Sequence, residues 1–267
     1  MPVPDPRPAL TEEVIVTTLR AAGCVFAEEE AGMLIAAAET PAALAAMVER
    51  RVAGLPLEHV IGWAEFCGLR IAVDPGVFVP RHRTEFLVSE AVARGRQGGV
   101  VVDLCCGSGA VGAALAAALD TTELYAVDLD PAAVACARRN LAAMGGRVWE
   151  GDLDEPLPVR LQGRVDVLTA NVPYVPTAEI ELLPREARLY EALVALDGGP
   201  DGLDVLRRVA AAAARWLAPN RGHLLIETSE LQAPQAVEIF AAHGLIPEVA
   251  SLDELDATVI IGAMPAA

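Results

Sequence analysis

The chain has 267 residues, of which 54% are apolar and only 4% aromatic, so its core must consist mainly of Ala, Val and Leu. The formal net charge of −17 disfavours direct binding of nucleic acid, because affinity for a phosphate backbone comes from Lys and Arg. No apolar run reaches the roughly 20 residues that cross a bilayer, and the N-terminal MPVPDPRPAL has no apolar signal core. Five cysteines without a CxxC pair indicate a reduced, cytoplasmic setting, and we expect neither a membrane partner nor a metal site.

The N-terminal part of the chain is predicted to be helical. Thr11 precedes the first helical stretch, Pro41 opens a later one, and Gly23 and Gly54 follow stretches as stop signals. The expected helices are 11–23, 28–39 and 41–54. Strand signals then run from residue 65 to residue 79, interrupted by turn residues, and predict a β-hairpin. We therefore predict a helical substrate-recognition domain at 1–60 and a hairpin linker at 61–85.

From residue 99 onward, predicted strands alternate with predicted helices. The strands are expected at 99–105, 123–130, 147–153, 164–174 and 222–230, with a last strand ending near 264. The helices between them are expected at 108–120, 131–145, 201–220 and 233–244. Alternation at this spacing is typical of a doubly wound, mostly parallel sheet, so we predict an α/β domain at 86–267.

The first strand of this domain leads into a glycine-rich turn. Cys105 and Cys106 end the strand, Gly107-Ser108-Gly109 forms the turn, and a helix follows. Glycines let the backbone bend sharply and let a ligand come close, and the helix N-terminus adds polar N–H groups. The stretch from Gly107 to Gly112 also fits the GxGxxG pattern of dinucleotide sites, so NAD and S-adenosylmethionine both compete for this turn.

Acidic residues follow three successive strands and favour S-adenosylmethionine over NAD. Asp128, followed by Leu129, is placed to accept hydrogen bonds from two ribose hydroxyls. Asp103, which lies before the first glycine, can organise the loop and face a methionine ammonium through water. Asp152, followed by Leu153, lies where an adenine amino group would be.

The strand at 164–174 ends in Asn171-Val172-Pro173-Tyr174, which we predict to be catalytic. Ligands of open α/β sheets bind beyond the carboxyl ends of the strands. The Asn171 oxygen and a neighbouring main-chain carbonyl can hold both hydrogens of an NH₂ group in line with a sulfonium methyl. Pro173 stiffens the turn, and Tyr174 offers a flat face to an amide or a ring.

With both loops in place, the sequence resembles the class I methyltransferases, and more narrowly the HemK or PrmC family, which methylates glutamine N5 in peptide release factors. The matching stretches are 57–62, 65–66, 75–81, 84–85, 190–199 and 201–203. The resemblance implies a Rossmann-like sheet with an antiparallel last strand, S-adenosylmethionine as cofactor, and a release factor or another glutamine-bearing protein as partner. It also implies that Gly107, Ser108, Gly109, Asp128, Leu153 and Asn171 line the cofactor. We expect a monomer.

The chain departs from this family pattern at several places. Val172 replaces the first Pro of the family's Asn-Pro-Pro-Tyr loop, which keeps the carbonyl but removes a fixed φ and part of the substrate wall. Cys105 stands where the family usually has Gly, so we expect less backbone strain there. The helical N-terminal part is short, and basic residues at 81–83 stand where the family tends to have Pro and an acid.

These departures leave other functions open. The alternatives are N-methylation of a small molecule, methylation of a nucleic-acid base amine, an NAD-dependent oxidoreductase, and a non-catalytic cofactor-binding scaffold. Glu227, at the end of a predicted strand, is expected to be structural.

Overall fold

The computed structural model describes residues 10–120 and 123–266, so MPVPDPRPA, on which part of the prediction for the N-terminus rests, lies outside the described residues. The chain divides into two compact units, one up to Trp63 and one from Ala64. The first unit is helical, as predicted, and adds one short helix that the sequence did not indicate. Its helices are α1 (Glu12–Ala21), α2 (Ala27–Ala37), α3 (Pro41–Val52) and α4 (Leu57–Ile61).

The first unit is a small bundle with its own core. Thr11 and Thr40 cap α1 and α3 by accepting hydrogen bonds from Val14 N and Ala43 N. The core side chains are Ile15, Leu19, Ala27, Ala31, Leu34, Val48 and Val60. Assignment of substrate recognition to residues 1–60 stays a prediction.

The predicted hairpin is shorter than expected. It consists of β1 (Trp63–Phe66) and β2 (Leu69–Ala72), joined at Cys67-Gly68, and the chain from 73 to 83 is irregular. The end of β2 agrees with the turn predicted from Asp74-Pro75-Gly76, where Pro75 also lacks an N–H for a strand partner. Val73, Val77 and Val79 nevertheless stay buried, in one cluster with Ala133 and Cys136.

The second unit is built on a seven-stranded sheet of order β5-β4-β3-β6-β7-β9-β8. The strands are β3 (Val100–Leu104), β4 (Glu123–Asp128), β5 (Arg147–Glu150), β6 (Val167–Ala170), β7 (His223–Thr228), β8 (Ile246–Leu252) and β9 (Ala257–Ala263). Neighbouring strands from β5 to β7 are parallel, and β9 is antiparallel to both β7 and β8. The predicted class I methyltransferase sheet, with an antiparallel last strand, is therefore confirmed.

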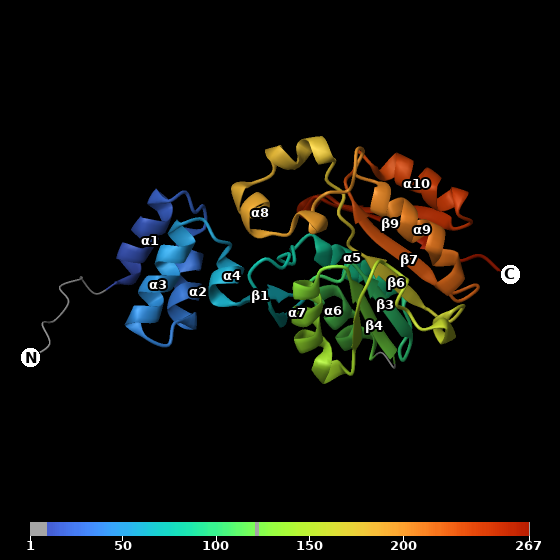
Figure 1. Ribbon diagram of the computed structural model, residues 1–267, viewed down its shortest axis with the longest axis horizontal. Helices are drawn as coiled ribbons and strands as arrows, with labels where there is room; N and C mark the ends of the chain where they lie inside the picture. The colour runs from blue at the N-terminus through green and yellow to red at the C-terminus, as the bar shows by residue number, and fades with distance from the viewer. Residues whose placement is uncertain (1–9, 121–122, 267) are drawn as a thin grey trace, which may run out of the picture. The chain divides into compact units, whose positions relative to one another are not determined.

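Helices cover both faces of this sheet (Figure 1). The helices of the second unit are α5 (Thr84–Arg94), α6 (Ala110–Leu119), α7 (Pro131–Leu141), α8 (Arg185–Tyr190), α9 (Asp204–Trp216) and α10 (Ala233–Ala242). Residues of α5, α6 and α7 share one buried cluster, and residues of α9 and α10 share the other. Neither α5 nor α8 was predicted from the sequence.

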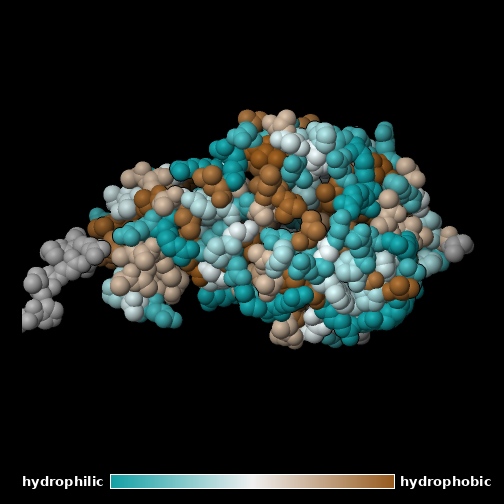
Figure 2. Space-filling view, in the orientation of Figure 1, coloured by the Kyte–Doolittle hydropathy of each residue, from teal (hydrophilic) through white to brown (hydrophobic). Residues whose placement is uncertain are grey.

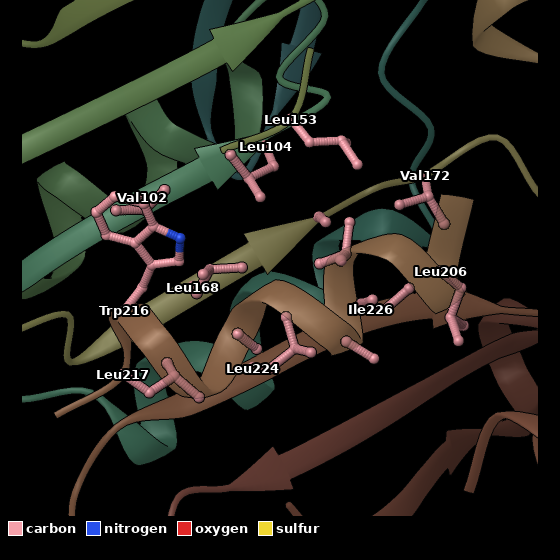
Figure 3. Packing of buried hydrophobic residues seen from close by; sticks show 14 of the residues in the cluster. Val102, Leu104, Leu153, Leu168, Val172, Leu206, Trp216, Leu217, Leu224 and Ile226 are labelled. Atoms are coloured by element: carbon pink, nitrogen blue, oxygen red, sulfur yellow. The ribbon is translucent and has the colours of Figure 1, made fainter. Parts of the chain in front are cut away.

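The core beneath the α9 side of the sheet reaches the loops that follow the strands. Figure 3 shows Leu104 of β3, Leu153 after β5 and Val172 after β6 converging with Leu206 of α9 and Ile226 of β7. All five of these side chains are at most 7% exposed. Packing of this density fixes where each loop leaves the sheet.

Candidate active site

The carboxyl ends of β4, β3 and β6 meet at the middle of the sheet. β3 pairs in parallel with β4 on one side and with β6 on the other, so the chain reverses its winding direction at β3. Open α/β sheets bind ligands at such a switch point. The two predicted loops, 103–109 and 171–174, leave the sheet there.

The glycine-rich turn is held in a strained backbone conformation. Cys105 has a φ of 53°, Gly107 of 54° and Gly109 of 80°. The expectation that Cys105 relaxes the turn is wrong, because this non-glycine residue keeps the left-handed conformation, at a steric cost. A Cβ on Gly109 would meet Ala137 and Leu141 at 3.2 Å, whereas one on Gly107 would meet nothing within 4 Å. Gly109 therefore serves packing, and the backbone at Gly107 faces open space.

Asp103 is buried behind this turn, at 1% exposure. Its Oδ2 accepts a hydrogen bond from Gly112 N of α6 at 3.0 Å, and its Oδ1 accepts one from the Thr169 hydroxyl of β6 at 3.0 Å. Burial raises the pKa of this carboxyl to about 7. The two hydrogen bonds lower the pKa, but burial has the larger effect. Asp103 thus ties the first turn of α6 to β3 and β6.

Asp128 fastens the turn from the neighbouring strand. Its Oδ2 accepts a hydrogen bond from Gly107 N at 2.7 Å, and its Oδ1 accepts one from Asp130 N at 2.9 Å. Burial raises its pKa, while these main-chain donors lower it. Leu129, which follows, is 53% exposed and lies beside the carboxylate as an open apolar surface.

The third acid, Asp152, lies after β5 and is paired with a helix on the other face. Its Oδ2 accepts a hydrogen bond from Arg208 Nη2 of α9 at 2.7 Å. Leu153 is 7% exposed and has a φ of 50°, so the chain turns sharply into the core there. Arg208 could not be predicted as the partner of Asp152, because 56 residues separate the two.

The three acids act together on one point of the turn. Burial, and then the charges of Asp128, Asp103 and Asp152, raise the pKa of the Cys105 thiol far above its usual range. Burial likewise raises the pKa of Cys106, so neither thiol is a nucleophile. The turn is therefore surrounded by acidic side chains, of which Asp152 is paired with Arg208, and acidic surroundings suit a cationic ligand.

The 171–174 loop leaves β6 with its hydrogen-bond acceptors open. The Asn171 amide nitrogen points to the Thr84 hydroxyl at 3.5 Å. In the described part of the chain, neither the Asn171 side-chain oxygen nor the Val172 carbonyl accepts a hydrogen bond. The Val172 side chain is 2% exposed and packs in the core, so its replacement of Pro leaves the exposed wall of the loop unchanged.

Tyr174 is positioned by three residues that are distant from it in the sequence and were not predicted as its neighbours. Its hydroxyl donates to Glu227 Oε1 of β7 at 3.3 Å, its carbonyl accepts from Gln232 Nε2 at 2.9 Å, and the Arg83 guanidinium lies 5.8 Å from its ring centroid. Burial and the Glu227 charge raise the Tyr174 pKa to about 12, so the phenol stays protonated. Only proximity in the fold reveals Arg83, Thr84 and Glu227 as neighbours of the loop.

Fold and site together define an α/β methyltransferase. Residues 68–202 match the methyltransferase small domain family. The chain is 41% identical over 208 residues to a release factor glutamine methyltransferase of Geobacter sulfurreducens, covering 77% of this chain and 72% of that protein. It is 39% identical over 220 residues to a release factor glutamine methyltransferase of Mycolicibacterium smegmatis, covering 80% of this chain and 77% of that protein. The chain belongs to the release factor glutamine methyltransferase family.

Other similarities are looser. A 4-amino-L-phenylalanine/4-methylamino-L-phenylalanine methyltransferase of Streptomyces pristinaespiralis is 36% identical over 204 residues, covering 74% of this chain and 69% of that protein. Among solved structures, a Pyrococcus furiosus methyltransferase matches with a TM-score of 0.57 and 17% identity, over 74% of this chain and 90% of that chain. A T. thermophilus 16S rRNA methyltransferase in complex with AdoMet and guanosine matches with a TM-score of 0.53 and 21% identity. The match covers 76% of this chain and 49% of that chain. The two structures support the fold alone.

Proposed function

We propose that this chain transfers a methyl group from S-adenosylmethionine to the side-chain amide nitrogen, N5, of a glutamine in a peptide release factor. The observation that carries the proposal is the similarity to relatives of that name, which reaches 41% identity and extends over three quarters of the chain. The open acceptor pair on the 171–174 loop supplies the chemistry that such a reaction needs.

The residues of the glycine-rich turn fit a sulfonium cofactor. Asp103, Asp128 and Asp152 bring three acidic groups to the turn, a setting that suits a cation. Open space at Gly107 lets a ligand approach the main chain. We assign the Asp128 carboxylate to the ribose hydroxyls and Asp152, with Leu153, to the adenine. Cys105, Cys106, Ser108, Gly109 and Leu129 form the walls, and Asp103 orders the turn from behind.

The 171–174 loop would position the glutamine. The Asn171 side-chain oxygen and the Val172 carbonyl are two acceptors that can take both amide hydrogens. This orients the nitrogen and increases its electron density in the transition state. S-adenosylmethionine supplies an electrophilic methyl group when bound. The amide proton becomes acidic only after methylation and can then leave to water, so no general base is needed beforehand. Pro173 and the Tyr174 ring would support the flat amide.

Exposed apolar side chains beside this loop support a protein as the acceptor. Leu182, Leu189 and Leu193 are 81%, 56% and 59% exposed, in the segment that carries α8. Figure 2 shows apolar side chains gathered on this segment. An exposed apolar patch next to a catalytic loop is typical of a protein-binding surface. None of the described helices is long and apolar enough to span a membrane. Cytoplasmic location and a monomeric state stay predictions.

The test is transfer of labelled methyl to purified release factor. The expected acceptor is the glutamine of the release factor's Gly-Gly-Gln (GGQ) motif. We expect the label on wild-type release factor and none on a release factor in which this glutamine is replaced by alanine. Equal labelling of both proteins, or labelling of neither, contradicts the proposal. A parallel titration with S-adenosylmethionine and with NAD tests the cofactor separately, and binding of NAD alone would overturn that part.

A small amine is the second candidate acceptor. The observation that favours it is the 36% identity to the aminophenylalanine methyltransferase of Streptomyces pristinaespiralis. The same acceptor pair could hold an aromatic NH₂ group. Labelled transfer to 4-amino-L-phenylalanine, with release factor unlabelled, would select this candidate.

A further inference from the structure

A cavity of about 90 Å³ lies beside the 171–174 loop, where β7 ends and β9 begins. A cavity of this volume has room for a small polar group such as an ammonium or a guanidinium. Its lining combines one cation with acids and hydroxyls. The lining residues are Arg83, Tyr174, Glu227, Thr228, Ser229, Glu230, Asp256, Ala257 and Thr258.

Glu227 is the buried acid of this cavity, and its hydrogen bonding is incomplete. Its side chain is 3% exposed. One oxygen, Oε1, accepts long hydrogen bonds from Arg83 Nε at 3.2 Å and from the Tyr174 hydroxyl at 3.3 Å. The other, Oε2, is buried and has no partner. A buried carboxylate oxygen without a donor is costly, so it requires an explanation.

Two other buried acids of the same unit show how the fold normally satisfies such a group. Glu191, with 1% of its side chain exposed, accepts hydrogen bonds from Val79 N and, with both oxygens, from Arg81 Nη2 at 2.7 and 2.8 Å. Asp166 likewise accepts hydrogen bonds with both oxygens, from Val100 N and from the guanidinium groups of Arg96 and Arg221. Glu227 differs from both, since its second oxygen has no donor, and Glu227 is among the residues that line the cavity.

The charge around the cavity indicates what the missing donor is. Glu227, Glu230 and Asp256 bring three carboxylates, against the single guanidinium of Arg83. Arg83 is also 40% exposed, so water screens much of its charge. A neutral N–H group would donate the missing hydrogen bond to Oε2 but would leave the excess negative charge. A cationic donor would supply the hydrogen bond and also compensate the charge.

We propose that this cavity is a subsite for a positively charged nitrogen group of the methyl acceptor, an ammonium or a guanidinium, with Glu227 Oε2 as its hydrogen-bond acceptor. The proposal rests on the proposed function, since it names a second group on the molecule that the 171–174 loop would hold. The Tyr174 hydroxyl joins Glu227 to that loop, so the cation would lie next to the methylated nitrogen and would select among acceptors.

The first experiment needs no methyl transfer. The protein is labelled with ¹³C in its three tyrosines, the Tyr174 ring signal is identified with Tyr174→Phe, and methylguanidinium chloride is titrated against N-methylurea, its neutral counterpart. We expect a saturable shift of the Tyr174 signal with methylguanidinium, at an affinity about tenfold or more above that of N-methylurea. Equal responses, or no saturable response, overturn the proposal from the wild-type protein alone.

Variants then assign the effect to Glu227. Glu227→Gln should remove the preference for the cation, because an amide presents at most one acceptor and no charge. Glu191→Gln is the matched control: it also neutralises a buried glutamate, and it should lower Tm and keep the preference. Glu230→Gln, on the exposed rim, should change the preference for methylguanidinium over N-methylurea by less than about threefold. A preference that survives Glu227→Gln, or that Glu191→Gln also abolishes, contradicts the assignment.

A kinetic arm connects the subsite with the acceptor. Glutamine peptides carry lysine, or neutral acetyl-lysine, at each position flanking the glutamine. We expect lysine at one position to lower KM about tenfold with little change in kcat, and Glu227→Gln to abolish that difference. A merely structural Glu227 would instead lower activity on both peptides alike, which contradicts the subsite. If the wild type methylates no glutamine peptide and no release factor, the proposed function fails, and the probe titration still decides the subsite.

Discussion

The two sides of the central strand β3 use their polar groups in opposite ways. On the β4 side, taken together with β3 and the glycine-rich turn that follows it, both carboxylate oxygens of Asp103 and both of Asp128 accept hydrogen bonds from within the described chain, one of them from Thr169 of β6. On the β6 side, the Asn171 oxygen has no partner there, and neither has the second oxygen of Glu227. The hydrogen bonds of one side are complete within the chain, whereas the other side has acceptors without a partner in the described chain.

This difference shows which side of the site is shaped in advance. A turn with its hydrogen bonds already made loses little freedom when it binds a ligand. A loop with open acceptors gains hydrogen bonds only from a molecule that brings donors to the right places, and this gives selectivity against molecules that lack them. We therefore expect substitutions on the β4 side to change stability and cofactor affinity, and those on the β6 side to change turnover.

The largest effect is expected from Asp103→Asn, measured as the free energy of unfolding against pH. The pKa of Asp103 rises from 3.8 to about 7 on folding, so the folded protein holds the proton more tightly. The contribution of Asp103 to wild-type stability should therefore be full below about pH 4 and should be lost as the pH rises from about 4 through about 7, by up to about 4 kcal/mol at 1.36 kcal/mol per unit.

The asparagine can still accept from Gly112 N and donate to the Thr169 oxygen, and it does not titrate. Its curve should lack the fall that Asp103 produces, so the difference between the two curves isolates this group. Parallel curves would show that Asp103 is not the titrating residue, and would weaken the contrast between the two sides.

Asn171→Ala should lower turnover at least a hundredfold, about 3 kcal/mol, while the cofactor Kd stays within about tenfold. The reason is the loss of one of the two amide acceptors in the transition state. Single-turnover kinetics and calorimetric titration measure the two quantities. Asn220→Gly is the control, because Asn220 is exposed and has a φ of 65° that glycine accepts. Near-normal turnover in Asn171→Ala would remove the assigned role.

Asp128→Ala should weaken cofactor binding by about 2 kcal/mol, or roughly thirtyfold in Kd, and should lower turnover at saturating cofactor much less. It removes the proposed ribose acceptor and the bond to Gly107 N. Asp130→Ala is the matched control, since Asp130 caps α7 by accepting from Ala132 N. That change should cost about 1 kcal/mol of stability and leave Kd within about threefold. Equal Kd values for the two variants would refute the ribose assignment.

Val172→Pro, which restores the family's loop, should have the smallest effect. The Val172 side chain lies in the core, and in the described residues its N–H donates no hydrogen bond that proline would remove. We expect stability to change by less than about 1.5 kcal/mol and kcat by less than about threefold. Thermal unfolding and steady-state kinetics measure both. A large gain in turnover would mean that the valine limits the loop.

Local patterns in the sequence predicted the parts of the fold that depend on neighbouring residues. The alternation of apolar strands and Ala-rich helices indicated the parallel sheet, and the turn residues at 107–109 and 171–174 marked its active edge. The predicted strand signal at 77–79, beyond the turn predicted at 74–76, forms no strand, and α5 was not predicted; both are failures of the same local reasoning. The hairpin signal continued past Pro75, and α5 begins without a side-chain cap.

Contacts between distant residues could not be predicted. The Asp152–Arg208 and Tyr174–Glu227 contacts join residues 56 and 53 positions apart, and no periodicity marks such pairs. The left-handed Cys105 was missed for another reason. Propensity argues against that conformation for a non-glycine residue, but the surrounding hydrogen bonds and packing outweigh propensity there.

The place of β9 in the sheet affects the order in which the protein can be completed during synthesis. β9 lies between β7 and β8, although it leaves the ribosome after both. A nascent chain that has emerged as far as β7 already contains β3 to β7 and the glycine-rich turn, and domains fold as their elements become available. Ala257 and Thr258, which close the Glu227 cavity, arrive with β9. The cofactor side can therefore assemble on the ribosome, while the cavity beside the 171–174 loop exists only once the last strand has been inserted.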